Sequence, residues 1–176
     1  MKHLNPSIFF ITGTSGAGKS TLVELLEQTL PKSQCAVHDF DAFGVPSHAG
    51  TAWRQEATEH WLKIANTYAA AGKSTIICGV CVPSEIIAAS IKPTAPVYFG
   101  LLDVPEKIIR QRLQDRCWNE ELISDNITWA VHLKNDVLAQ EDPFVIACTE
   151  YTGPQDTADK VTAWIKNKAS TTSTPS

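Results

Sequence analysis

Short apolar runs alternate with longer amphipathic segments along most of this chain. Each apolar run is bounded by Gly, Pro or Asp and is hydrophobic almost throughout, as are strands that are covered on both faces of a sheet. These runs predict five strands, at Ser7–Thr12, Gln34–His38, Ser74–Cys78, Pro96–Leu102 and Phe144–Cys148.

The segments between the runs repeat their apolar residues at helical spacing. One such segment repeats its apolar residues at intervals of four, four, three and four, at Trp53, Ala57, Trp61, Ile64 and Tyr68. Its aromatic rings could stack on a ligand, but this spacing favours a stripe that faces the core. Further helices are predicted at Lys19–Leu30, Pro105–Cys117, Asn119–Leu138 and Gln155–Asn167, and the third of these is expected to bury Val131 together with Ile123 and Ile127. Strands that alternate with helices predict an α/β fold, a three-layer α/β/α sandwich around a parallel sheet.

Composition narrows the class of protein without changing this picture. The 176 residues fit one domain, 1–169, followed by a Ser-, Thr- and Pro-rich tail, 170–176, which we expect to be disordered. Hydrophobic residues make up 43% of the chain and charged residues 19%, which argues against a disordered polar chain. No apolar run approaches the ~18–20 residues that span a bilayer, so we expect no membrane segment.

Charge and cysteine content point the same way. A net charge of −4, from 15 basic and 19 acidic residues, argues against a nucleic-acid binder. The apolar run Ile8–Ile11 is too short for a signal peptide, and five cysteines leave one unpaired in any disulfide scheme. We therefore expect a cytoplasmic protein with reduced thiols. The pair Cys78 and Cys81 is expected to be two buried thiols, since no second ligand pair for zinc accompanies it.

A glycine-rich segment after the first predicted strand matches the phosphate-loop pattern G-x-x-x-x-G-K-[ST] at every fixed position. Its glycines let backbone N–H groups wrap around phosphate oxygens, and the following helix N-terminus attracts the anion. Lys19 supplies a charge for the β- and γ-phosphates, and the Ser20 hydroxyl is a hard ligand for Mg²⁺. The pattern predicts a nucleoside triphosphate site formed by Gly13, Thr14, Ser15, Gly16, Ala17, Gly18, Lys19, Ser20 and Thr21.

The short length and this loop resemble the small phosphate-loop kinases, which include nucleoside monophosphate, shikimate, gluconate and adenylylsulfate kinases. From His38-Asp39-Phe40-Asp41 through Gly44-Val45-Pro46 to Trp53-Arg54, the chain is most similar to uncharacterised bacterial members of that superfamily. The resemblance implies ATP and Mg²⁺ as nucleotide and cofactor, a sheet of order 2-3-1-4-5, and a small helical lid at about 117–138. It also implies an acceptor-binding region at about 41–72.

Two acidic residues end the second predicted strand. Alternate residues at a strand end project to the same side, so Asp39 and Asp41 can face one volume, although a solvated turn would use Asp in the same way. By the resemblance, Asp39 lies near Mg²⁺ with Ser20, and Asp41 contacts or deprotonates the acceptor hydroxyl. Arg54 could hold a phosphate or carboxylate of the acceptor, or be an ordinary exposed helix arginine.

Two arginines follow the fourth predicted strand. Their four-residue spacing puts Arg112 and Arg116 on one helical face. The resemblance implies that the first packs on adenine and the second reaches the phosphates, while the alternative is a solvated basic stripe. The glycine between the two cysteines, Gly79, is expected to leave room beside the phosphate loop.

The lid segment departs from the family, because it holds four acidic residues and no further arginine. The sequence therefore favours an ATP-dependent small-molecule kinase with catalytic Lys19, Asp41 and Arg116. It leaves open a nucleotide-binding switch or partner-dependent ATPase, for which a protein partner would be needed.

Overall fold

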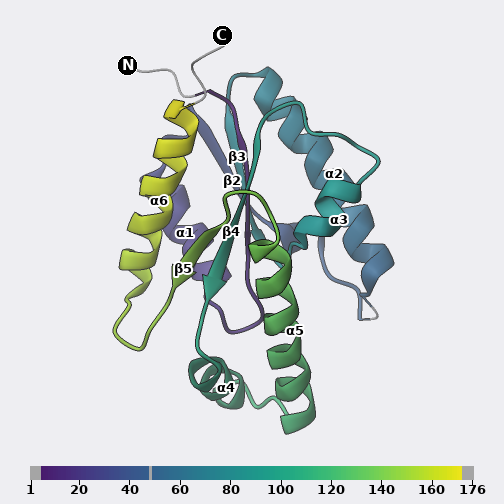
Figure 1. The fold of residues 1–176 in the computed structure, drawn as a ribbon, viewed down its shortest axis with the longest axis vertical. Coiled ribbons are helices and arrows are strands. Elements are labelled where there is room, and N and C mark those ends of the chain that lie inside the picture. The colour runs from purple at the N-terminus through teal and green to yellow at the C-terminus, as the bar shows by residue number, and fades with distance from the viewer. Residues whose placement is uncertain (1–4, 48, 172–176) are drawn as a thin grey trace.

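The computed structural model describes residues 5–47 and 49–171, which form an α/β fold around one sheet (Figure 1). All five strands are parallel, in the order β2-β3-β1-β4-β5. Their bounds are β1 Ile8–Thr12, β2 Cys35–Asp39, β3 Ser74–Gly79, β4 Val97–Asp103 and β5 Phe144–Ala147. The predicted fold class and strand order are therefore confirmed, with no strand end shifted by more than one residue.

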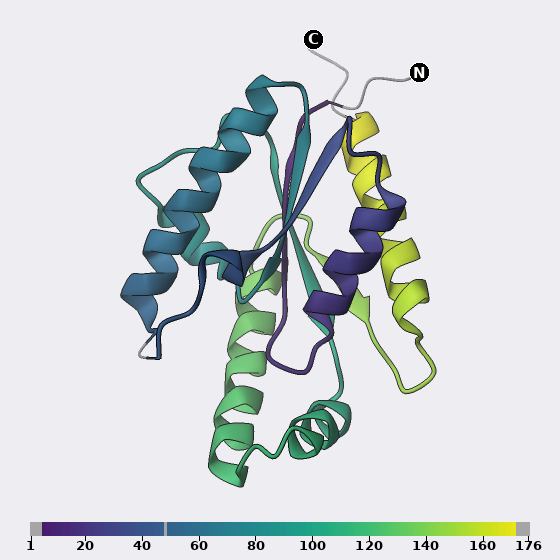
Figure 2. The ribbon, with the colours of Figure 1, turned by 180° about the vertical axis from the view of Figure 1, so that it is seen from behind.

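Helices cover both faces of the sheet (Figures 1 and 2). Their bounds are α1 Lys19–Thr29, α2 Thr51–Ala70, α3 Pro83–Ala88, α4 Glu106–Asp115, α5 Glu120–Leu138 and α6 Pro154–Thr171, with a short 3-10 segment, η1, at Phe40–Phe43. Helices α1 and α6 lie on one face and α2 and α3 on the other, while α4 and the start of α5 extend beyond the carboxyl ends of the strands. The described helices include none that is long and apolar enough to cross a membrane.

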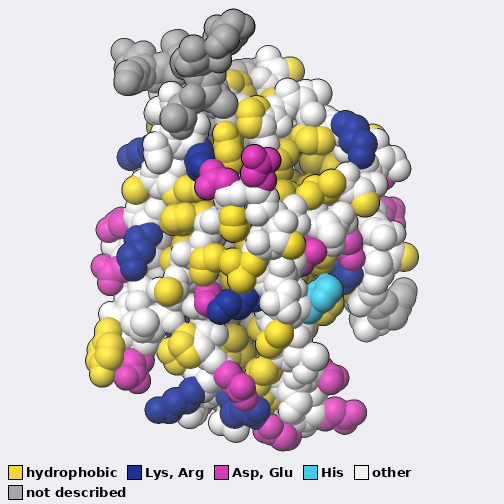
Figure 3. Space-filling model, in the orientation of Figure 1, with side chains coloured by type: hydrophobic (Ala, Val, Ile, Leu, Met, Phe, Trp, Pro, Cys, Tyr) yellow, Lys and Arg dark blue, Asp and Glu magenta, His cyan; other side chains and the backbone are white. Residues whose placement is uncertain are grey.

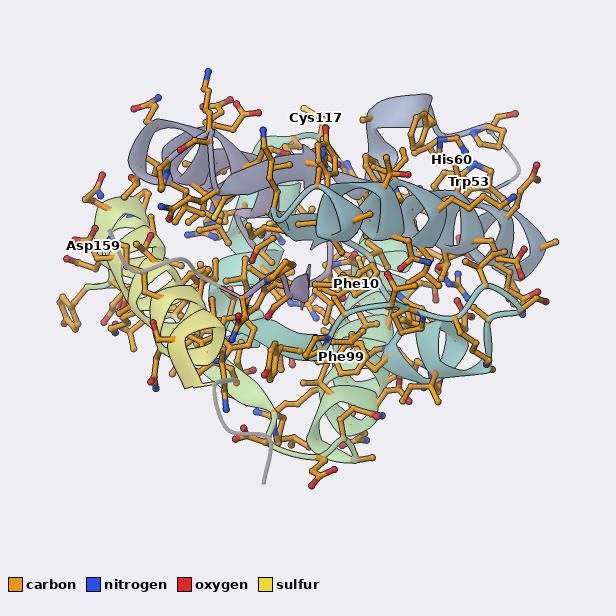
Figure 4. All side chains as sticks on the ribbon, turned by 90° about the horizontal axis from the view of Figure 1, so that it is seen from above. Phe10, Trp53, His60, Phe99, Cys117 and Asp159 are labelled. Carbon is orange, nitrogen blue, oxygen red and sulfur yellow. The ribbon has the colours of Figure 1, made fainter. Side chains whose placement is uncertain are left out.

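The core is divided by the sheet into two clusters. On the α2 side, Phe10 and Phe99 from β1 and β4 stack with their ring centroids 6.3 Å apart (Figure 4). The α2 stripe joins this cluster, with Trp61 and Ala57 buried and Trp53 packed against it. The interpretation of that stripe as core is therefore confirmed.

Helix α5 corrects one expectation. Val131 is 57% exposed, whereas Leu133 is fully buried. At about 100° per residue, Ile123, Leu133 and Val137 share one face of the helix. Val131 lies on nearly the opposite side of the helix axis from Leu133, outside that face. The apolar character of Val131 alone was a misleading guide to the buried face.

The chain ends differently from the prediction as well. Helix α6 continues through Thr171, so the first two residues of the expected disordered tail are helical. The rest of that predicted tail, 172–176, lies outside the described residues.

Candidate active site

The phosphate loop connects β1 to α1 at the carboxyl edge of the sheet (Figure 2). Gly16 and Gly18 have φ angles of 83° and 97°, which favour glycine, and they turn the loop back on itself. A Cβ atom on Gly13 would lie 2.9 Å from that of Ala17, so the two ends of the loop pack closely. Thr14 is buried, whereas Gly18, Ser20 and Thr21 are exposed. The loop therefore offers an open backbone surface to an anion.

The Lys19 side chain reaches back across this loop. Its Nζ donates a hydrogen bond of 2.7 Å to the Thr14 carbonyl oxygen. Burial lowers the pKa of Lys19, while the carboxylates of Asp41 and Asp39 act in the opposite direction. The two acidic residues and the lysine thus lie within electrostatic reach of one another, as expected for groups at one phosphate site.

Asp39 and Asp41 are held on a tight turn between β2 and α2. Asp39 precedes η1, and its Oδ1 accepts a 2.9 Å hydrogen bond from the backbone N–H of Asp41 in the first turn of η1. The buried Trp61 donates its Nε1–H to the Phe40 carbonyl oxygen at 2.9 Å. A Cβ on Gly79 would lie 2.1 Å from Phe40 Cβ. Gly79 was expected to leave room beside the phosphate loop, but the space next to it is filled by Phe40. The reason is that the chain after β2 crosses the end of β3.

The carboxyl group of Asp41 is chemically distinct from that of its neighbour. Desolvation by the surrounding protein raises the pKa of Asp41, and repulsion from Asp39 adds to this effect while Lys19 opposes it. A carboxylate with a raised pKa is a better proton acceptor than an ordinary one. It is suited to general-base chemistry beside the phosphate loop.

The oxygen donors of these side chains suit a hard divalent cation, but they do not complete its coordination shell by themselves. Ser20 supplies a hydroxyl and Asp39 a carboxylate, both of which Mg²⁺ accepts as ligands. In the described part of the chain, no three His, Cys, Asp or Glu side chains are grouped to hold a metal. Phosphate oxygens of a bound nucleotide would have to complete the coordination shell, as is common for Mg²⁺.

Helices α4 and α5 contact the other side of the phosphate loop. Arg112 donates an Nη1–H to the Gly16 carbonyl oxygen at 2.7 Å, and Asn126 donates an Nδ2–H to that of Ser15 at 3.1 Å. The side chain of Arg116 forms no hydrogen bond or ion pair within residues 5–47 and 49–171. Both arginines border a cavity of about 190 Å³ that also includes Gly18, Cys148 and Thr152.

Other cations of α4 and α5 form ion pairs. Arg110 pairs with Glu106 and Glu120, and Lys134 Nζ lies 2.7 Å from Asp103 Oδ2. Figure 3 shows acidic and basic side chains gathered at the lower end of the molecule, over α4 and the start of α5. Arg116 therefore differs from Arg110 and Lys134, because it borders the cavity and its side chain forms no ion pair within the described residues.

Arg54 lies at the start of α2, and it is already paired. Its Nε and Nη2 donate to Glu85 Oε2 and Oε1 at 2.7 and 2.6 Å, and its guanidinium carbon lies 5.2 Å from the centroid of the Trp129 ring. Sequence reasoning missed Glu85 and Trp129. The position of Glu85, just past the carboxyl end of β3, is the signal that could have drawn attention to it.

The two cysteines at the end of β3 are Cys78 and Cys81. Both are buried and free, and burial raises the pKa of each thiol. The interpretation as buried thiols is confirmed.

Comparison with known proteins places this fold. No family model matches the chain, and no curated protein matches it by sequence. A sugar kinase from Janibacter sp. HTCC2649 aligns with 95% of this chain and 99% of its own, at a TM-score of 0.68 and 19% identity. A gluconokinase from Sinorhizobium meliloti 1021 aligns with 96% of this chain and 95% of its own, at 0.64 and 13%.

Both neighbours match over almost their full lengths, and the sheet order and the phosphate loop lie where the resemblance required. At identities of 19% and 13%, the likeness shows the fold alone. The chain has the fold of the small phosphate-loop kinases.

Proposed function

We propose that this protein is a kinase that transfers the γ-phosphoryl group of ATP to a hydroxyl group of a small-molecule acceptor, with Mg²⁺. The observation that carries the proposal is the placement of Asp41. Its carboxyl group lies within electrostatic reach of Lys19 on a turn fixed by Trp61 and Phe40, and its pKa is raised. A phosphate site with a proton acceptor beside it suits transfer to a hydroxyl.

In this proposal, the residues from Gly13 to Thr21 bind the phosphates of ATP. Backbone N–H groups of the loop and the Lys19 ammonium neutralise their charge, since the N-terminus of α1 begins there. Arg116 reaches the phosphates from the lid, and Arg112 keeps the lid against the loop through Gly16. The cavity beside these arginines would receive the base.

Ser20 and Asp39 would hold Mg²⁺, together with phosphate oxygens. The cation would neutralise the phosphate charge and orient the phosphates. Holding Asp39 against the backbone N–H of Asp41 keeps the two carboxylates in separate roles, one beside the cation and one beside the acceptor.

Asp41 orients the acceptor hydroxyl and accepts its proton. The hydroxyl oxygen forms a bond to the γ-phosphorus as the bond to the β–γ bridging oxygen breaks, and ADP leaves. Positioning and charge neutralisation by Lys19 and Arg116 supply most of the rate, because phosphoryl transfer needs little covalent help. Arg54 and its partner Glu85 border the acceptor side.

The structural neighbours support this choice, because one is described as a sugar kinase and the other as a gluconokinase. A second candidate function is a nucleotide-binding switch or partner-dependent ATPase. Helices α4 and α5 favour it, because Arg110 and Lys134 are paired with acidic neighbours and Arg112 is bonded to the Gly16 carbonyl oxygen. Arg116 is therefore the one arginine of this region whose side chain forms no hydrogen bond or ion pair within the described residues.

The test is ADP release from Mg-ATP, measured with and without pools of nucleosides, nucleoside monophosphates, sugars, sugar acids and hydroxy acids. Stimulation by one pool, absent from the Lys19→Ala variant, supports the kinase. Slow ADP release that is indifferent to every pool contradicts it and supports the switch or partner-dependent ATPase.

A further inference from the structure

We propose, on the basis of the kinase function above, that the acceptor is an uncharged hydroxyl compound such as a sugar or polyol, and that Glu85 excludes anionic acceptors by neutralising Arg54.

Arg54 is the cation that an acidic acceptor would need on this side of the site. It lies at the start of α2, next to Trp53, whose ring packs edge-on against Phe40 at a centroid distance of 6.1 Å. Phe40 in turn lies between Asp39 and Asp41. The Arg54 backbone is therefore fixed beside the turn that carries the proposed base.

The Glu85 carboxylate occupies the hydrogen-bonding edge of Arg54 that would hold an anion. The two bonds, at 2.7 and 2.6 Å, form the bidentate arrangement by which arginine recognises a carboxylate or phosphate. The side chains are only 16% and 15% exposed, so solvent screens the pair weakly. Trp129 of α5 lies over the guanidinium, and Nη2 also lies 3.4 Å from Thr51 Oγ1. An anion would have to displace Glu85 and leave its carboxylate largely buried and unpaired.

The negative charges around the turn also repel an anion. Asp39 and Asp41 are acidic, and Lys19 is directed into the phosphate loop, where it bonds to Thr14. With Arg54 and Glu85 cancelling each other, the acceptor side is left with net negative charge. An uncharged polyhydroxy compound is not repelled there, and its hydroxyl groups can donate hydrogen bonds to these carboxylates.

The first experiment compares related acceptors with and without an anionic group, with the unaltered protein. ADP release from Mg-ATP is measured with glucitol and gluconate, glycerol and glycerate, and ribose and ribose 5-phosphate. We expect stimulation by one or more uncharged members and none by their anionic counterparts. Stimulation that is equal or greater with an anionic member overturns the inference while leaving the kinase proposal intact. If no member stimulates, the acceptor pools described above are compared in the same way. Stimulation only by an uncharged pool supports the inference, stimulation by an anionic pool overturns it, and indifference to every pool contradicts the kinase proposal and this inference with it.

The second experiment releases Arg54. Glu85→Gln keeps the shape of the side chain and one oxygen acceptor but removes the charge. We measure binding of gluconate and of ribose 5-phosphate to protein loaded with Mg²⁺ and a non-hydrolysable ATP analogue. Binding should tighten at least about tenfold, as expected for one new charge-assisted contact.

Two further variants control this measurement. Glu56→Gln removes the same charge from an exposed position on α2 and should leave anion binding unchanged. Adding Arg54→Gln to Glu85→Gln should abolish the gain. If Glu85→Gln binds both anions no better than Glu56→Gln does, the inference is wrong. The acceptor comparison decides the question even if the Glu85 variant unfolds.

Discussion

At the scale of single residues, the site depends on how one turn is held. The position of Asp41 is supported by hydrogen bonds of its own backbone and by the contacts of its neighbours. Asp39 accepts the N–H of Asp41, Trp61 donates to Phe40, and Gly79 leaves the space into which Phe40 packs. The proposed base is therefore placed by residues that do not themselves react.

Replacing Asp41 by Asn tests its role most directly. The amide cannot accept the acceptor proton, so kcat for the stimulated reaction should fall roughly 10²–10⁴-fold, with little change in ATP affinity. Because burial raises the pKa of Asp41 above its ordinary 3.8, the acid limb of the wild-type kcat profile should lie above that value. The ionised form is needed, so activity is lost as the pH falls. Pre-steady-state kinetics and nucleotide titration measure both effects, and an equal loss of ATP binding would instead move Asp41 to the metal.

Gly79→Ala tests the support of the turn. The added methyl would lie 2.1 Å from Phe40 Cβ, and no flexible side-chain end is available to move aside. We expect a loss of about 1–3 kcal/mol in the free energy of unfolding, from overpacking, together with reduced kcat. Urea denaturation measures the first quantity. Gly50→Ala is the control, since an added Cβ there meets nothing within 4 Å, and unchanged stability in Gly79→Ala would show that the turn is loosely held.

Residue identity alone predicted the phosphate loop and the acidic pair, because both are local patterns. It did not predict the partner of Arg54, since Glu85 is 31 positions away and only the packing of α3 on α2 brings the two together. For the same reason, Gly79 was linked to the phosphate loop when its close neighbour is Phe40. Contacts between distant segments decide which of several chemically reasonable partners a side chain meets.

At the scale of elements, the helices that cap the carboxyl edge of the sheet differ in how they meet the loop. Helix α4 brings two arginines to the same side, but Arg112 spends its Nη1–H on the backbone of Gly16. The side chain of Arg116, at the end of the same helix, forms no hydrogen bond or ion pair within the described residues. In the proposed kinase, the first arginine holds α4 against the phosphate loop and the second is left for the nucleotide.

Arg116→Ala should therefore reduce kcat by about a hundredfold or more without changing the unfolding temperature, because a cation on the transferring phosphoryl group has a large effect on rate. Arg110→Ala provides a matched control, since it removes the same side chain from a position six residues earlier on another face of the helix. Arg110 is partly exposed and paired with Glu106 and Glu120, so its loss should change kcat by less than about twofold. Steady-state kinetics measures the loss of kcat in both variants. Equal losses would argue that α4 contributes only general positive charge.

Element boundaries could be predicted wherever an apolar run was long enough to show its period. Helix α3 was missed because Pro83–Ala88 is too short to display one, and η1 was missed because a 3-10 turn has no such signature. In α5, Leu133 rather than Val131 is buried, since the face is chosen by what the helix packs against.

At the scale of the whole molecule, nucleotide binding should appear as stability. A ligand that binds only the folded state adds about 2.7 kcal/mol at a hundred times its Kd, which is roughly 5–10 °C in Tm for a chain of this size. Saturating Mg-ATP should raise Tm by that order. Chelation of Mg²⁺ with EDTA should remove much of the shift, since free ATP then brings uncompensated negative charge toward Asp39 and Asp41.

Two variants show whether this shift arises at the proposed site. Lys19→Ala removes the cation that bonds across the loop, so its Tm should respond weakly to Mg-ATP. Asp41→Asn should keep the full shift, or exceed it, because this residue is assigned to the acceptor and its charge repels the phosphates. Differential scanning fluorimetry measures all of these responses. An undiminished shift in Lys19→Ala would place the nucleotide elsewhere in the molecule and would remove the basis for assigning the loop, the lid and the base to one reaction.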